Sequence, residues 1–67
     1  GEYRIPVEVK YRQRIDAHRD TIGLRAFIEK TVYRAPFGVL VTLSDDTVPD
    51  IDPRIVVLPL SSLLLMR

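Results

Sequence analysis

The sequence contains no cysteine, so no disulfide framework stabilises the chain. It also lacks a long apolar run, and its longest run of apolar residues is far short of the ~20 that a membrane-spanning helix requires. The first residues, Gly1 to Arg4, do not form a signal-peptide pattern. Together these absences predict a soluble cytoplasmic protein that has no membrane partner.

The chain is short as well, and its 67 residues make one domain at most. A chain of this size buries only about 60% of the surface that its unfolded form exposes, so its stability is marginal. Its composition, 46% hydrophobic and 28% charged, is that of a globular domain and not of a disordered segment. We therefore expect residues 1–67 to be a single domain that needs a partner or a further segment.

Charge is unevenly distributed between the two halves of the chain. Residues 1–34 hold eight Lys and Arg against five Asp and Glu, whereas residues 35–67 hold two against four. A basic end of this kind suits a phosphate backbone, although an ordinary solvated face explains the same counts.

Hydrophobic periodicity predicts the elements in order. Residues 3–12 alternate strictly, which predicts a strand whose apolar side chains (Tyr3, Ile5, Val7, Val9, Tyr11) share one face. The proline at position 6 cannot donate to a sheet, so we expect this to be an edge strand. Apolar residues spaced by three and four then predict a helix over about 20–34, capped by Asp20 or Thr21 and ended by Ala35-Pro36.

The second half predicts two further strands. Residues 37–43 are rich in β-branched residues without alternation, which indicates a central strand buried on both faces. Residues 44–53 form a loop, 54–58 a short strand ended by Pro59, and Ser61 or Ser62 caps a last helical turn whose leucines pack back on the sheet. The predicted fold is therefore α/β: a three-stranded sheet with a right-handed βαβ crossover, an extra strand and a short C-terminal helix.

Glu8 and Lys10 lie two residues apart on the polar face of the first strand, which brings a carboxylate and an ammonium side by side. A metal-dependent phosphodiesterase uses such a pair. The carboxylate holds a hard cation such as Mg²⁺, while the lysine orients water or stabilises charge on the phosphate. Alternating strands with charged outer faces also produce Glu-x-Lys by chance, so the motif alone is weak.

Four segments in sequence order extend this motif: IPVEVKY at 5–11, DxxGLxxFIxK at 20–30, GVLVT at 38–42 and IVVLPLxxLL at 55–64. Over nearly its whole length the chain resembles the C-terminal domain of unknown function of many prokaryotic AAA-family ATPases. That domain is similar to the PD-(D/E)xK, or restriction-endonuclease-like, nucleases. The resemblance implies that this chain is half of such a nuclease core and therefore a truncated C-terminal domain.

The resemblance also implies roles for individual residues. Glu8 and Lys10 match the catalytic (D/E)xK pair, with Glu8 as the metal ligand for Mg²⁺ or Mn²⁺ in the parent protein. No tightly bound cofactor is expected in the isolated chain, because the first acidic residue of the family motif has no counterpart here. A Gly-rich phosphate loop is also missing, so the ATPase would belong to an upstream domain.

Other charged residues carry weaker hypotheses. A phosphate-binding surface can be lined by four arginines: Arg12, Arg14, Arg19 and Arg25. The first three are our candidates for nucleic-acid binding. The alternative is that all four form an ordinary solvated face. The single histidine, His18, is interpreted as a solvated loop residue. The aspartates at 45, 46, 50 and 52 lack EF-hand spacing and indicate turns. Five aromatic residues are predicted in the core: Tyr3, Tyr11, Phe27, Tyr33 and Phe37.

Three functions remain open on the sequence alone. The chain is part of a nuclease-like domain whose parent binds or cuts DNA, a non-catalytic accessory or protein-interaction domain of an ATPase, or an unrelated α/β interaction module. Since three strands and one helix leave sheet surface uncovered, the isolated chain is also expected to self-associate.

Overall fold

The computed structural model describes residues 2–45 and 47–65. Along the chain the elements are β1 (Val7–Lys10), the 3-10 turn η1 (Arg19–Thr21), α1 (Ile22–Glu29), the 3-10 turn η2 (Thr31–Tyr33), β2 (Gly38–Thr42), β3 (Ile55–Pro59) and α2 (Leu60–Leu64). The α/β class and the order of strands and helices predicted from the sequence are confirmed.

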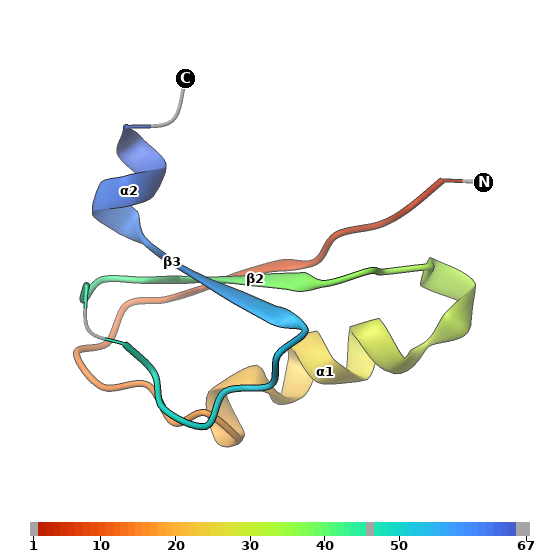
Figure 1. Ribbon diagram of the computed structural model, residues 1–67, viewed down its shortest axis with the longest axis horizontal. Coiled ribbons are helices and arrows are strands. Elements are labelled where there is room, and N and C mark those ends of the chain that lie inside the picture. The colour runs from red at the N-terminus through yellow and green to blue at the C-terminus, as the bar shows by residue number, and fades with distance from the viewer. Residues whose placement is uncertain (1, 46, 66–67) are drawn as a thin grey trace.

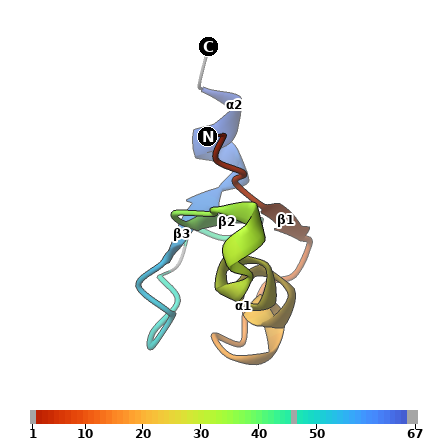
Figure 2. The same ribbon diagram turned by 90° about the vertical axis from the view of Figure 1, so that its right-hand side faces the viewer.

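The three strands form one parallel sheet with β2 in the centre, in the order β1-β2-β3. Figures 1 and 2 show that α1 and the connection from β2 to β3 lie on the same side of this sheet, while α2 lies on the other. Both crossovers are right-handed in these views, as parallel strands require. Each new strand is added on the same side of the previous one, so two right-handed crossovers lie on the same face of the sheet. The opposite face is left to α2.

The register of the strands assigns each side chain to one of these faces. The helix face, toward α1, carries alternate residues of each strand: Glu8, Lys10, Gly38, Leu40, Thr42, Ile55, Val57 and Pro59. The aliphatic face, on the side of α2, carries the others: Val7, Val9, Val39, Val41, Val56 and Leu58. Contacts to α1 settle which face is which, because a Cβ at Gly38 would meet the side chains of Ile28 and Leu24.

The core lies between the helix face and α1. Its buried side chains are Leu24, Leu40 and Ile55, and the partly buried Ile15, Ile28 and Ile51 pack against them. A fully buried aliphatic side chain contributes about 1.5–3 kcal/mol, so this small cluster supplies much of the apolar stabilisation. The centre of β2 is the best-packed segment, since the side chains of both Leu40 and Val41 are fully buried.

The prediction for the first strand was wrong in its length and in its buried side. Only residues 7–10 pair with β2, and Tyr3 and Tyr11 are 73% and 70% exposed. Tyr3, Ile5, Val7, Val9 and Tyr11 are exposed and outside the core. The reason is the position of the crossover, which places α1 over the polar side of β1.

The predicted helix over 20–34 is also broken into shorter pieces. α1 ends at Glu29, η2 follows, and Arg34 takes a left-handed φ of 53° before Pro36. β-branched Thr31 and Val32 favour this early end, because they lose side-chain freedom in a helix. Neither predicted cap forms, since α1 begins without a side-chain cap at Thr21 and the Asp20 carboxylate has other partners.

The predictions for the C-terminal region were only partly correct. β3 includes Pro59, and α2 begins at Leu60 without a serine cap, because the Ser61 hydroxyl donates to Asp45 instead. α2 does contact β3 and β2, yet its later leucines, at 63–65, are exposed.

Of the five aromatic residues, Phe27 and Tyr33 are partly buried and stack with ring centroids 4.1 Å apart, while Phe37 is exposed. None of the five belongs to the buried core.

Candidate functional site

Glu8 and Lys10 lie next to each other on the helix face of β1. The Lys10 Nζ is 3.0 Å from the Glu8 Oε2, and the two side chains are 27% and 33% exposed, respectively. On the neighbouring strand β2, Leu40 lies beside Glu8 and Thr42 lies beside Lys10. The pair is therefore at the border of the core, half shielded from water and still open on one side.

A glycine of α1 makes room for the carboxylate. A Cβ at Gly23 would lie 3.3 Å from the Glu8 Oε1, which is tighter than an ordinary side-chain contact. The absence of a side chain at this position lets Glu8 lie close to the first turn of α1. There the positive end of the helix dipole stabilises a carboxylate. The sequence pattern gives no signal for this contact between Gly23 and Glu8.

This geometry allows part of the chemistry that the Glu-x-Lys motif suggests. The carboxylate of Glu8 is a suitable oxygen ligand for Mg²⁺ or Mn²⁺, and Lys10 places a positive charge within hydrogen-bonding distance. In residues 2–45 and 47–65, no three His, Asp or Glu side chains are grouped so as to hold a metal ion.

The three arginines proposed for nucleic acid do not form one free basic surface. Arg12 pairs with the buried Asp20, and Arg19 lies 3.7 Å from Asp16. Arg14 lines a separate hollow near the end of β2 with Thr42 and Ser44. All three side chains nevertheless reach solvent from the segment that joins β1 to α1.

Asp16 and Asp20 organise that segment because their carboxylates accept hydrogen bonds from backbone N–H groups. The Asp16 carboxylate accepts from the backbone N–H groups of His18 and Arg19, and the Asp20 carboxylate accepts from the N–H of Asp16 at 2.7 Å. The two backbone bonds to Asp16, from Arg19 first and then from His18, lower the pKa of its carboxyl group. An aspartate placed two to three residues before a helical turn is the local signal for the bonds that Asp16 accepts.

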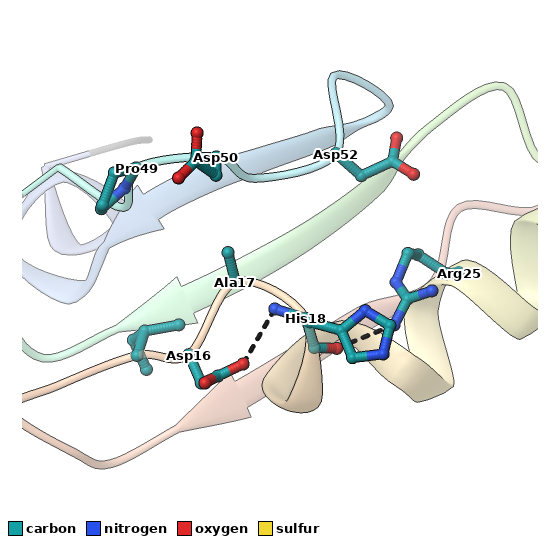
Figure 3. Close-up of a pocket in the computed structure, with 8 residues that line it drawn as sticks. Asp16, Ala17, His18, Arg25, Pro49, Asp50 and Asp52 are labelled. Carbon is teal, nitrogen blue, oxygen red and sulfur yellow. Dashed lines mark hydrogen bonds between the residues drawn. The ribbon is translucent and has the colours of Figure 1, made fainter.

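His18 contributes to a hollow beside the start of α1. Its side chain is exposed, as predicted, and its Nδ1 is 3.2 Å from Arg25 Nη2, which also donates to the His18 carbonyl at 2.8 Å. Figure 3 shows the loop around Asp16 and His18 facing the β2–β3 loop around Pro49 and Asp50 across this hollow. Arg25, which also donates to the Thr21 hydroxyl, is therefore engaged in local structure.

In the aspartate-rich loop, the described side chains serve turns and ion pairs. Asp52 accepts from the backbone N–H and the guanidinium of Arg54, and these bonds, the side-chain bond first, lower its pKa to about 2. Arg54 also reaches Glu29 of α1, which ties the loop to the helix. Asp50 has a left-handed φ of 61°, a conformation that Asp tolerates in turns. Asp46 lies outside the described residues.

The fold and this site define a small α/β domain with a parallel sheet and a half-buried Glu-x-Lys pair. Comparison of the chain with models of protein families, with curated proteins and with solved structures finds no match. Within the described residues, no helix has the length and apolar character required to cross a membrane.

Proposed function

We propose that this chain contributes the Glu-x-Lys half of a nuclease-like site in the C-terminal domain of a prokaryotic, cytoplasmic AAA-family ATPase. One observation carries this proposal: Glu8 and Lys10 are adjacent, half-exposed and on the same side of a strand that leads into a right-handed crossover. The parent protein binds DNA and cleaves it with Mg²⁺ or Mn²⁺. Its upstream part supplies the missing acidic ligand and the ATPase.

The roles of the two residues follow from their surroundings. Glu8 would be the residue of this chain that holds the metal ion, and Gly23 leaves room for its carboxylate because it has no side chain. The Lys10 side chain is less exposed than that of Glu8, and Lys10 lies at the end of β1 beside Thr42. Its ammonium group is therefore directed toward the carboxylate of Glu8. That arrangement suits a lysine that orients water or stabilises charge on a phosphate.

DNA would be held by the neighbouring basic segment. Arg12, Arg14 and Arg19 follow β1 directly and reach solvent, although ion pairs to Asp20 and Asp16 offset part of their charge. Contacts of this kind position the phosphate backbone without reading its sequence. Replacement of Arg14 by alanine should therefore weaken DNA binding on all sequences and reduce its salt dependence.

A second candidate function, a non-catalytic accessory domain, is favoured by the same ion pair. At 3.0 Å, Glu8 and Lys10 satisfy each other, and an exposed or half-exposed pair contributes at most about 1 kcal/mol. In that case the domain acts through its surface, and the pair is a structural element of β1.

The test is Mg²⁺- or Mn²⁺-dependent DNA cleavage by the full-length protein, with Glu8→Gln and Lys10→Ala variants. We expect both variants to lose cleavage, while Lys30→Ala, which removes an exposed lysine just after α1, retains it. Absence of cleavage of linear, supercoiled and branched DNA by the unsubstituted protein would favour the accessory domain. Retention of full cleavage by Glu8→Gln would exclude Glu8 as a metal ligand.

A further inference from the structure

The aliphatic face of the sheet carries two rows of apolar side chains across the three strands. The register aligns Val7, Val39 and Val56 in one row and Val9, Val41 and Leu58 in the next. Neither row contains a polar or charged residue. In parallel sheets a face of this composition is normally covered by helices.

Coverage of this face is incomplete. Val41 is only 1% exposed, and α2 contacts β2 and β3 on this side, whereas Val7 at the β1 edge is 61% exposed. Val9 and Val56 are exposed as well. Both crossovers lie on the opposite face, so neither of them can cover these valines.

α2 itself presents a second apolar surface on the same side of the sheet. Leu64 is 72% exposed, and Leu63 and Leu65 are also exposed, even though α2 already packs on β3 and β2. One chain thus carries both a sheet face that lacks a covering helix and a helix with uncovered leucines. Figures 1 and 2 show that α2 stands on the side of the sheet opposite α1, which is the side of the aliphatic face.

We propose that two copies of this chain associate through these surfaces, with α2 of each copy seated on the exposed valines of the other. Because the two surfaces lie on the same side of one chain, a two-fold axis can satisfy both contacts at once, as an isologous dimer requires. The pairing also extends the contacts that α2 makes with β3 and β2 within its own chain. The inference does not depend on the nuclease-like site, whose residues lie on the opposite face.

The exposed apolar area is of the size that a dimer needs. The exposed fractions of Val7, Val9, Val56 and the leucines at 63–65 amount to on the order of 600 Å² per copy, against the ~800 Å² that each partner contributes to a standard interface. A patch above a few hundred Å² is larger than monomers ordinarily expose.

Sedimentation velocity of the 67-residue chain over a range of concentrations tests this inference. We expect a monomer–dimer equilibrium whose dissociation constant rises at least tenfold in Leu64→Asp and in Val7→Asp. The matched control is Val32→Asp, which places the same charge at a valine that is 79% exposed on η2, and which should leave the equilibrium unchanged. A monomer at every concentration, or equal effects of all three substitutions, would overturn the proposal.

A crosslinking experiment keeps the test valid if a charged variant unfolds. The chain has no cysteine, so Val7→Cys and Leu64→Cys chains can be mixed and joined with a short bis-maleimide. We expect a crosslinked heterodimer from this mixture and little from Val32→Cys mixed with Leu64→Cys. Equal crosslinking in both mixtures would show random collision and would contradict the assigned surface.

Discussion

The guanidinium of Arg12 and the carboxylate of Asp20 form an ion pair of 2.8 Å between residues on opposite sides of the β1–α1 loop. The Asp20 side chain is only 3% exposed, and it also accepts the backbone N–H of Asp16. One buried carboxylate therefore fixes both ends of the loop that follows the candidate site.

Removal of this carboxylate should destabilise the chain. We expect Asp20→Ala to lower the free energy of unfolding by about 1–3 kcal/mol, because it leaves the Asp16 N–H and the Arg12 guanidinium without their partner. Asp45→Ala, which removes an exposed carboxylate bonded to Ser61, should change it by no more than about 0.5 kcal/mol. Urea unfolding followed by circular dichroism measures both, and equal losses would contradict the role of Asp20.

Gly23 should affect the position of Glu8 more than it affects stability. The Cβ of Gly23→Ala would lie 3.3 Å from the Glu8 Oε1, and this flexible carboxylate can move toward solvent by a few tenths of an ångström. We therefore expect a gain of up to about 1 kcal/mol from the higher helix propensity of alanine, together with a displaced Glu8. Thermal unfolding measures the gain, and NMR shifts of the Glu8 side chain report the displacement.

The reverse substitution in the same helix is the control. Ala26 is exposed on α1, so Ala26→Gly should cost about 1 kcal/mol through propensity alone and leave the Glu8 resonances unchanged. A loss of stability in Gly23→Ala would show that the carboxylate cannot move away from α1.

Acid should weaken the contribution of Asp52. Its hydrogen bonds to Arg54 lower the pKa from 3.8 to about 2, so the folded state favours the charged carboxylate. The resulting stabilisation is present in full above about pH 4 and is lost as the pH falls from about 4 toward 2. The stability difference between the unsubstituted chain and Asp52→Asn should therefore shrink over this range in urea unfolding. A difference that is the same at pH 6 and pH 2 would contradict this linkage.

Leu40 should be the most sensitive position in the core. Its side chain is fully buried at the centre of β2, against Leu24 and Ile55. We expect Leu40→Ala to cost about 2–5 kcal/mol, enough to unfold most of a chain this small. The exposed Val32→Ala should stay within about 0.5 kcal/mol, and a folded Leu40→Ala with an unchanged melting temperature would show that the core lies elsewhere.

The order of the elements could be predicted from the sequence because each carries a local signal. The β-branched run at 38–42 and the alternation around Val7 each indicate a strand whatever the tertiary context. What alternation cannot specify is which face the helix covers. Here the crossover places α1 over Glu8 and Lys10, and the more apolar side of β1 remains outside.

The candidate site could be predicted only in part for the same reason. Glu8 and Lys10 are two residues apart on one strand, so their proximity follows from local geometry. The contact of Gly23 with Glu8 and the pairing of Arg12 with Asp20 depend on how the loop returns to the sheet, and no pattern of residue types fixes that path. The arginines therefore looked freer in the sequence than they are.

The all-parallel sheet has a consequence for how fast this chain folds. Because neither strand pair is joined by a hairpin, every ladder requires closure of a long loop: Val7 pairs with Val39, and Gly38 pairs with Ile55. Closing a loop twice as long costs about 0.6 kcal/mol more, which favours the β2–β3 ladder, and we therefore expect β1 to join the sheet later. Non-local contacts of this kind slow folding relative to helical domains of equal length. Until β1 docks, one edge of β2 has no paired strand, and we expect the Glu-x-Lys pair to be among the last features to take its native position.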